Sequence, residues 1–340
     1  MSPPPILLVV VDTEEEFDWS APFARDNTSV HAMADIHRSQ EICDRFGIRP
    51  VYVMDYPIAT QEEGWLPLKE FVEDGRAVIG AHLHPWVSPP FIEELTIANT
   101  FPGNLPAELE EEKLTLLTRQ IQTVIGKKPK IYKAGRYGFG PNTPAILEKL
   151  GYEIDLSPSP PFDFGPGHGP DFSRTSNHPQ RITPGGGIFS FPATGDYVGR
   201  WATSRRHAHR LHRLASTPLL SALRLPGILS RFRLLERIRL SPEGHSPDEL
   251  ERLTVALIRR GLNVFSLTLH SPTLRPGCTP YVKNKEDLNR FLKTLGQYFH
   301  FFINSLGGIA LTPLELKMRL EALTPHCGLA MHNLNETTSP

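Results

Sequence analysis

The residues most suited to chemistry in this sequence are carboxylates that follow an apolar run near its beginning. Six consecutive apolar residues, 6–11, predict a buried strand, and Asp12 and Glu14 come directly after it. Residues two apart point to the same side of a strand, so both carboxylates would face one space. Such carboxylates can bind a metal ion or accept a proton, although a solvated acidic loop has the same composition.

Histidines follow two later apolar runs. His82 and His84 follow AVIGA with the same spacing of two, and His270 ends the run LNVFSLTLH. Two imidazoles with one carboxylate suit zinc with an open position for water. The other carboxylate, Asp12, would then act as general base and His270 as general acid, and Arg136 would keep the base ionised by charge pairing.

These residues need a scaffold that brings distant segments together. Apolar strands alternate with amphipathic helices along the chain, and the C-terminal ends of parallel strands converge in a barrel. About seven such units predict a distorted, incomplete (β/α)7 barrel of parallel strands over residues 5–322, followed by a polar tail at 323–340. The expected strands are 6–11, 50–55, 77–84, 130–135, 152–157, 188–198, 262–270 and 308–311, and the main expected helices are 28–47, 66–74, 106–125, 143–150, 246–261 and 286–305.

The segment 200–240 differs from its surroundings. It holds ten arginines and three histidines against one acid, Glu236, interleaved with Leu, Ile and Phe, and predicts a helical insertion that is broken at Pro218 and Pro226. Two interpretations are open. Its leucines pack on the barrel while its arginines are solvated or pair with acids such as 110–112, or the segment forms a basic amphipathic face that contacts anionic lipid or phosphate.

The overall composition excludes several classes of protein. A formal charge of −1 with 21% charged residues is typical of a globular protein and lacks the basicity of a nucleic-acid binder. Three distant cysteines, Cys43, Cys278 and Cys327, favour neither a disulfide framework nor a cysteine zinc site. The first residues do not have the pattern of a signal peptide and no apolar run reaches 18 residues, so we expect a cytoplasmic protein without transmembrane segments.

Five motifs together carry a resemblance to a known family. VVVDTEE, GAHLHPW, AGRYGFG, YEIDLSP and FSLTLHSP follow one another along the chain. This order resembles the polysaccharide deacetylase family, which has the NodB-homology fold, and most of all a WalW-like bacterial branch linked to cell-surface polysaccharide biosynthesis. The resemblance covers nearly the whole chain. It implies a (β/α)7 barrel and a metal-dependent hydrolase, acting on carbon–nitrogen bonds other than peptide bonds, that removes N-acetyl or O-acetyl groups from a glycan or glycan precursor.

The resemblance also assigns roles by position. It implies Asp12 as catalytic base, Arg136 as partner of that base, His270 as general acid, and Glu14, His82 and His84 as ligands of a divalent metal ion, zinc above all. Two departures stand out: Glu14 replaces an aspartate, and the family's histidine pair is separated by three residues where this pair is separated by one. We expect Glu15, Glu16 and Asp18 to be solvated or to cap a loop.

The expected substrate contacts are aromatic and polar. Trp86 and Tyr137 would line a sugar-binding groove because aromatic faces pack on sugar rings, although they fit ordinary loop packing equally well. Asp155 would bind sugar hydroxyls or cap a turn. A different class of function remains open, in which the barrel binds a glycan or a partner within a polysaccharide assembly complex without turnover.

Overall fold

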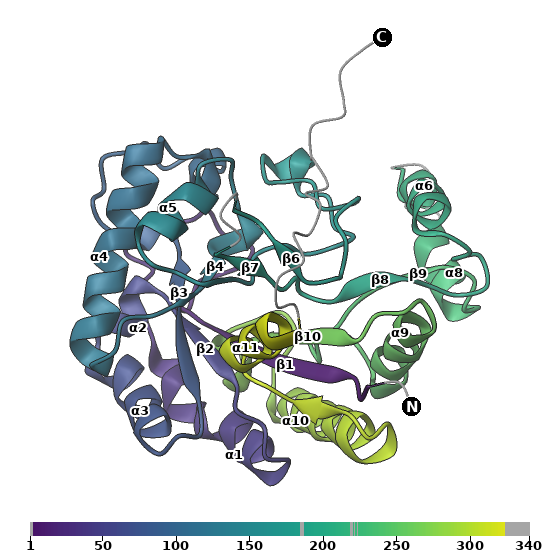
Figure 1. Ribbon diagram of the computed structural model, residues 1–340. Helices are drawn as coiled ribbons and strands as arrows, with labels where there is room; N and C mark the ends of the chain where they lie inside the picture. The colour runs from purple at the N-terminus through teal and green to yellow at the C-terminus, as the bar shows by residue number, and fades with distance from the viewer. Residues whose placement is uncertain (1–2, 184–186, 218–219, 221, 223, 324–340) are drawn as a thin grey trace.

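A curved sheet of mostly parallel strands forms the centre of the protein, as the computed structural model shows for residues 3–183, 187–217, 220, 222 and 224–323 (Figure 1). The strands are β1 (Ile6–Thr13), β2 (Val51–Met54), β3 (Val78–Leu83), β4 (Ile131–Ala134), β5 (Ile154–Asp155), β6 (Gln180–Arg181), β7 (Phe189–Ser190), β8 (Gly195–Val198), β9 (Glu236–Arg239), β10 (Val264–His270) and β11 (Ile309–Ala310). The α-helices are α1 (His37–Arg45), α2 (Tyr56–Thr60), α3 (Glu62–Glu73), α4 (Ala107–Ile125), α5 (Thr143–Lys149), α6 (Arg205–Ala215), α8 (Leu225–Arg231), α9 (Pro247–Arg259), α10 (Lys285–His300) and α11 (Pro313–Leu323).

The sheet is an incomplete barrel. Its order is β10-β1-β2-β3-β4-β5-β7-β6, with β11 paired to the beginning of β1, and every pair except β6 with β7 is parallel. A few hydrogen bonds bridge the gap between β7 and β10: the Thr194 amide donates to the Ser266 carbonyl at 3.1 Å, the Ser266 amide donates to Oγ1 of Thr194 at 2.8 Å, and the Thr268 amide donates to the Leu240 carbonyl at 3.0 Å. The expected distorted (β/α)7 barrel is therefore confirmed.

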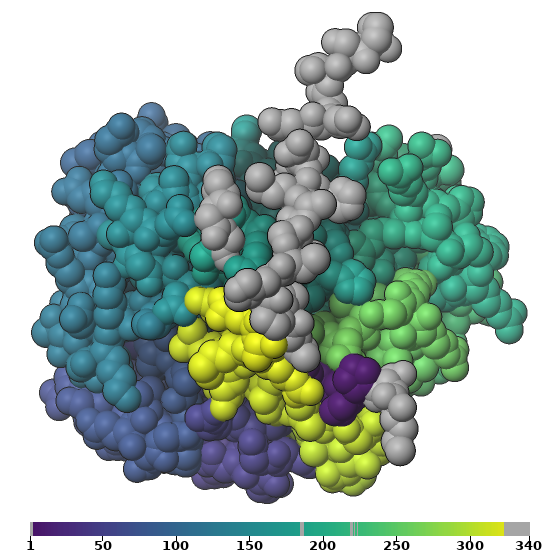
Figure 2. Space-filling view, in the orientation of Figure 1, coloured from purple at the N-terminus to yellow at the C-terminus, as the bar shows by residue number. Residues whose placement is uncertain are grey.

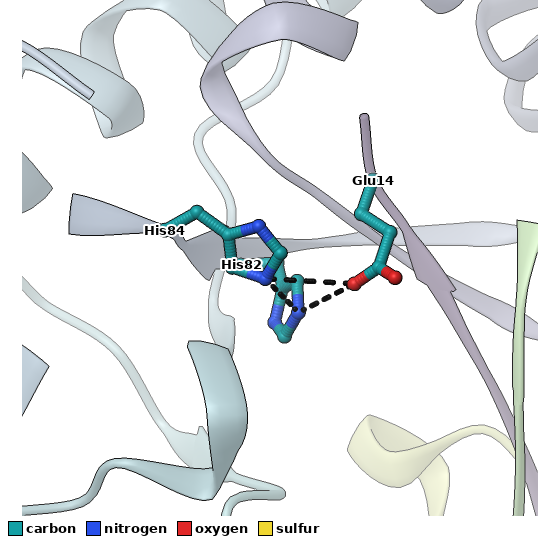
Figure 3. A group of neighbouring side chains, drawn as sticks. All are labelled: Glu14, His82 and His84. Carbon is teal, nitrogen blue, oxygen red and sulfur yellow. Dashed lines mark hydrogen bonds and ion pairs between the residues drawn. The ribbon is translucent and has the colours of Figure 1, made fainter. Parts of the chain in front are cut away.

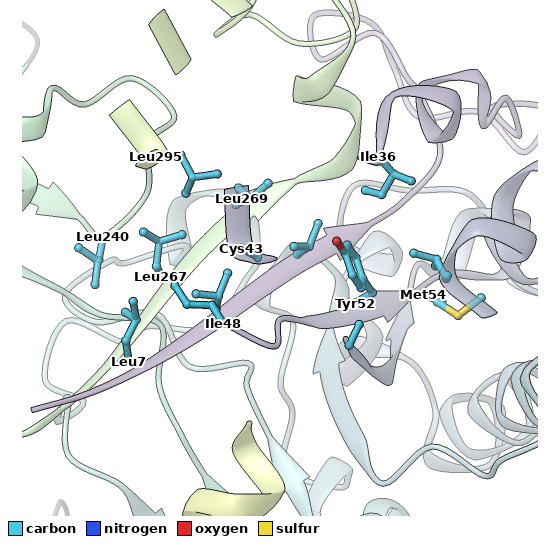
Figure 4. Packing of buried hydrophobic residues seen from close by; sticks show 14 of the residues in the cluster. Leu7, Ile36, Cys43, Ile48, Tyr52, Met54, Leu240, Leu267, Leu269 and Leu295 are labelled. Carbon is cyan, nitrogen blue, oxygen red and sulfur yellow. The ribbon is translucent and has the colours of Figure 1, made fainter. Parts of the chain in front are cut away.

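Alternating side chains divide the core into two parts. Strand β1 is buried along its whole length, so one set of its residues faces the barrel interior and the other faces the surrounding helices. The inward set is Ile6, Leu8 and Val10, and the outward set is Leu7, Val9 and Val11. In Figure 4 the outward side of β1, β2 and β10 packs with Ile36, Cys43 and Leu295 from the helical layer.

Helix α11 closes the N-terminal end of the barrel. Its Leu316 is fully buried in the interior cluster with Ile6 and Leu8, and Lys317 pairs with Glu153 at 2.7 Å, just before β5. Figures 1 and 2 show this helix in yellow at the middle of the face toward the viewer. With one end covered in this way, the C-terminal ends of the strands are left for a site.

Several elements differ from expectation. The expected strand 188–198 divides into β7 and β8, because β8 leaves the barrel and pairs with β9 in a separate antiparallel sheet. The expected helix 28–47 has a 3-10 turn at His31–Asp35 before α1, and the helix expected at 66–74 begins earlier, as α3 at Glu62. Helix α9 begins as expected at Ser246, which forms a capping box with Glu249. The predicted tail beyond Leu323 lies outside the described residues.

The insertion 200–240 is only partly helical. It contains α6 and α8 but ends in β9. The apolar side chains of α6 and α8 pack with Tyr197 of β8, whereas Ile238 and Leu240 join the core of the barrel as expected. The expectation that its arginines pair with the acids at 110–112 is wrong for the two that form ion pairs: Arg205 pairs with Asp196, and Arg233 pairs with Asp248. Proline 218 lies outside the described residues. Among the described helices, none is long and apolar enough to cross a membrane.

Candidate active site

Side chains from four strands meet at the C-terminal end of the barrel. The inward alternation of β1 continues past Val10 to Asp12 and Glu14, and the alternation in β3, β4 and β10 continues in the same way from the interior residues Val78, Ile131 and Val264. This alternation brings His82 and His84 from β3, Lys133 from β4 and His270 from β10 to the same pocket. The predicted residues Asp12, Glu14, His82, His84 and His270 are thus neighbours in space.

Glu14, His82 and His84 form a compact cluster (Figure 3). The two Nε2 atoms lie 3.0 Å apart, and Oε2 of Glu14 lies 3.5 Å from each of them. All three side chains are buried. The spacing of two in the histidine pair suits this arrangement because both imidazoles leave the strand on its inward side.

Hydrogen bonds on the far side of each ring fix the tautomers. Nδ1 of His82 lies 2.9 Å from the Lys133 carbonyl oxygen, which can only accept, so this Nδ1 donates. Nδ1 of His84 lies 2.8 Å from Oε2 of Glu15 and donates to that carboxylate when it is ionised. In a neutral imidazole the other nitrogen is then an acceptor. Two acceptors that face each other at 3.0 Å beside a carboxylate repel unless a cation lies between them, so the cluster fits a divalent metal ion.

Burial keeps the two imidazoles neutral. It lowers the pKa of both His82 and His84 to about 4, and the neighbouring carboxylates only partly oppose this effect. Burial likewise raises the pKa of Glu14 to about 7. Neutral imidazoles are the form that binds metal ions.

Glu15 has a larger role than expected. It is fully buried, not solvated: its carboxylate accepts from His84, and its backbone amide donates to Oδ2 of Asp55 at 2.7 Å. Asp55 follows β2 and caps α2 by accepting from the Ile58 amide. Burial raises the pKa of both carboxyl groups, that of Glu15 to about 7. Glu15 and Asp55 therefore orient His84 from behind.

Lys133, not Arg136, pairs with the expected base. The Lys133 ammonium donates to both carboxylate oxygens of Asp12, and both groups are buried. Burial would raise the pKa of Asp12, but Lys133 and the histidines lower it to about 2. The pairing predicted for Arg136 is wrong because Arg136 and Tyr137 follow β4 in left-handed conformations, at φ 53° and 59°, which turn the guanidinium toward Thr100.

His270 is held by a second carboxylate that sequence reasoning missed. Nδ1 of His270 lies 2.8 Å from Oε2 of Glu243, whose other oxygen accepts from the His270 amide and from Thr273. Nε2 of His270 lies 3.6 Å from Oδ2 of Asp12. Burial would lower the pKa of His270, but Glu243 and Glu14 raise it to about 10. The imidazole is therefore protonated at neutral pH.

A pocket of about 290 Å³ opens over these groups. Asp12, Glu14, the histidines and Lys133 form its polar part, and aromatic and arginine side chains form the rest. The other lining residues are Phe17, Trp19, Phe23, Trp86, Phe101, Ala134, Arg136, Tyr137, Phe164, Arg239 and Tyr281. Such a mixture of aromatic walls and convergent polar groups is typical of a binding site for a small polar ligand.

The predicted substrate contacts divide between the pocket and the core. Trp86 and Tyr137 line the pocket, although Trp86 is fully buried and stacks on His84 with ring centroids 4.2 Å apart. Of the two roles predicted for Asp155, sugar binding is wrong, because alternation turns its side chain to the outer face of β5, and capping a turn agrees with the structure. There it is buried and accepts from Ser157 and Ser190, so it stabilises the turn after β5.

Comparisons with known proteins identify the fold. No family model matches the sequence, and no curated protein matches it either. A solved structure from Mycobacterium smegmatis, provisionally named a polysaccharide deacetylase, superposes with a TM-score of 0.54 at 15% identity over 96% of this chain and 95% of that one. The allantoinase Puue has a TM-score of 0.50 at 12% identity over 96% of both chains. The peptidoglycan N-acetylglucosamine deacetylase Bc1960 has a TM-score of 0.44 at 7% identity, over 91% of this chain and 86% of that one. The chain has the fold shared by the first two proteins, and the WalW-like branch stays a prediction.

Proposed function

We propose that this protein is a metal-dependent hydrolase that removes acetyl groups from a glycan or glycan precursor in bacterial cell-surface polysaccharide metabolism, with N-deacetylation as its reaction. One observation carries the proposal. A single pocket contains a cluster of two acceptor imidazole nitrogens and one carboxylate, and beside it an ionised aspartate and a protonated histidine. The fold shared with the Mycobacterium smegmatis protein, and the motifs noted in the sequence, support it.

His82, His84 and Glu14 would hold the ion, which we propose is zinc. Two imidazoles and one carboxylate are the ligand set of catalytic zinc sites that keep one open position. When bound, zinc lowers the pKa of water and polarises a carbonyl group. The rest of the pocket supplies the groups that move protons.

Asp12 would accept the proton of the attacking water. With a pKa of about 2 it is ionised throughout the neutral range, and Lys133 holds both of its oxygens in place. So low a pKa makes Asp12 a weak base for ordinary water, which is consistent with a reaction in which the water is acidified.

His270 would donate a proton to the departing amine. An amine leaves an acetyl group only when its nitrogen is protonated, and Glu243 keeps the His270 imidazolium charged at neutral pH. Nε2 of His270 lies 3.6 Å from Asp12, so the two groups reach one reacting centre. This distance supports their assignment to a single reaction.

Metal analysis combined with an acetate-release assay tests the proposal. We expect about one zinc ion per chain after reconstitution, and release of acetate from N-acetylated oligosaccharides. Asp12→Asn and His270→Gln should each lower kcat by about 10² or more, whereas Asp18→Asn, an exposed acid near the same strand, should not. A zinc-loaded protein that binds such glycans without releasing acetate would instead favour the non-catalytic barrel.

We also propose that the insertion contacts anionic lipid. Trp201, Leu214, Ile228 and Phe232 are between 46% and 65% exposed, close in the chain to many arginines. Apolar side chains beside arginines are typical of segments that lie on an anionic membrane.

Vesicle flotation tests this contact. The protein should float with vesicles that contain anionic phosphatidylglycerol, less so at high salt, and not with neutral phosphatidylcholine alone. The double variant Trp201→Ser, Phe232→Ser should lose most of the binding, whereas Met318→Ser, which removes an exposed apolar residue from α11, should not. Failure to float at low salt would eliminate the contact.

A further inference from the structure

Two guanidinium groups, those of Arg136 and Arg239, line the pocket, and neither has a carboxylate partner among the residues that the structure describes. The acids of the same pocket are already engaged, since Asp12 pairs with Lys133 and Glu14 lies against the two histidines. Among the described residues, no ion pair is formed by Arg136 or Arg239. The pocket therefore offers two positive charges that its own side chains do not neutralise.

Arg136 is held in a defined orientation. Its guanidinium lies over the rings of Phe101 and Phe23, 4.0 and 4.8 Å from their centroids, and Nη1 donates to Thr100. Burial alone lowers its pKa to about 10, with no acid to oppose the effect. When aromatic rings pack on the flat faces of a guanidinium, the N–H groups at its edge can still donate to a planar oxyanion.

Arg239 approaches the pocket from outside the barrel. It ends β9, and its guanidinium lies over the rings of Phe162 and Tyr137, 4.2 and 4.9 Å from their centroids. Its Nε is buried and has no hydrogen-bond partner in the part of the chain that the structure describes. A buried N–H of a charged group is costly to leave unpaired, so this donor is suited to a ligand atom.

We infer that the substrate is an acetylated sugar that carries an oxyanion, a carboxylate or a phosphate, which Arg136 and Arg239 bind. The inference rests on the proposed function for the acetyl group and adds the chemical class of the molecule that bears it. It also gives the insertion a role at the site, because Arg239 belongs to the strand with which the insertion ends. Guanidinium groups favour carboxylates and phosphates through paired, charge-assisted hydrogen bonds.

Titration calorimetry with three sugars tests the inference. The probes are N-acetylglucosamine, N-acetylglucosamine 1-phosphate and N-acetylmuramic acid, measured with the metal-free protein so that turnover does not interfere and the Asp12–Lys133 pair stays intact. We expect at least one anionic sugar to bind about tenfold or more tightly than the neutral sugar at low salt. A preference for only one of them identifies the oxyanion. Arg136→Gln and Arg239→Gln, added singly, should each reduce that preference about tenfold.

Arg237→Gln is the matched control. Arg237 lies on β9 two residues from Arg239 but outside the pocket, so its loss should leave the preference unchanged. Equal binding of neutral and anionic sugars, a preference that survives both pocket substitutions, or no binding of any probe at millimolar concentration would overturn the inference. Anionic preference without acetate release from the unsubstituted protein would contradict the proposed function alone, and acetate release without preference would contradict the inference alone.

Discussion

Glu243 is the carboxylate that contacts His270 most closely, which makes Glu243→Gln a sharp test of the role of His270. Glu243 accepts from Nδ1 at 2.8 Å and, together with Glu14 and Asp12, raises the pKa of His270 to about 10 against the effect of burial. Without that charge, we expect the His270 pKa to fall by about 1 to 3 units. Because a general acid works only while protonated, the alkaline limb of the kcat/KM profile should move to lower pH by the same amount.

The profile is measured as acetate release between pH 6 and pH 11. Glu249→Gln, which removes a surface carboxylate from the cap of α9, serves as the control and should leave the limb in place. An unchanged alkaline limb in Glu243→Gln would show that His270 is not the group that titrates there.

Gly135 determines the position of His84. A Cβ added at residue 135 would lie 2.4 Å from Cδ2 of His84 and 2.4 Å from the Leu83 carbonyl oxygen, distances that require His84 or its strand to move. We therefore expect Gly135→Ala to weaken zinc binding about tenfold or more, as happens when groups that orient a ligand are altered. Competition with a chelator measures it. Gly167→Ala, where nothing lies within 4 Å, is the control, and equal zinc affinity in both variants would contradict this role.

At the scale of residues, position at a strand end was the useful signal. Asp12, Glu14, His82, His84 and His270 could be predicted because apolar runs precede them and the period of a strand orients them. The partners of Asp12 and His270 lacked such a signal: Lys133 lies inside a strand, and Glu243 in an irregular turn after the insertion. The predicted pairing of Arg136 with Asp12 is wrong because residues in left-handed conformations interrupt the strand alternation after β4.

At the scale of elements, α11 is expected to stabilise the barrel without taking part in its chemistry. Leu316 is fully buried among the inward residues at the end of the barrel opposite the pocket. Leu316→Ala should lower the free energy of unfolding by about 2 to 5 kcal/mol through lost burial and a cavity. Urea denaturation measures the loss, while kcat/KM should stay within about twofold of the parent at 25 °C.

Met318→Ala is the matched control on the same helix, since Met318 is 62% exposed and its loss should cost about 0.5 kcal/mol or less. A similar loss in both variants would show that α11 does not close the barrel as described.

The barrel elements could be predicted because each is apolar with one clear period. The departure of β8 from the barrel could not be predicted, because its pairing with β9 depends on residues about 40 positions away.

At the scale of the whole molecule, the cluster proposed to bind the ion joins segments that are far apart in the chain. Its three side chains come from β1, β3 and the residues directly after these strands, and the groups that orient them come from β4 and the beginning of α2. An ion that binds only the folded protein stabilises all of these connections, by about 2.7 kcal/mol when its concentration is 100 times its Kd. Zinc should therefore raise the Tm of the metal-free protein by roughly 5 °C.

Thermal unfolding with and without zinc, followed by circular dichroism, measures this shift independently of any substrate. Glu14→Gln and His82→Ala should each remove most of the zinc-dependent rise, because a site with two remaining ligands binds the ion far more weakly. Asp18→Asn should keep the full rise. If both ligand variants kept it too, the ion would be bound elsewhere on the protein. If zinc left the Tm of all four proteins unchanged, the parent included, no ion would bind at this site. The close approach of the two imidazoles would then have to be explained by a proton shared between them.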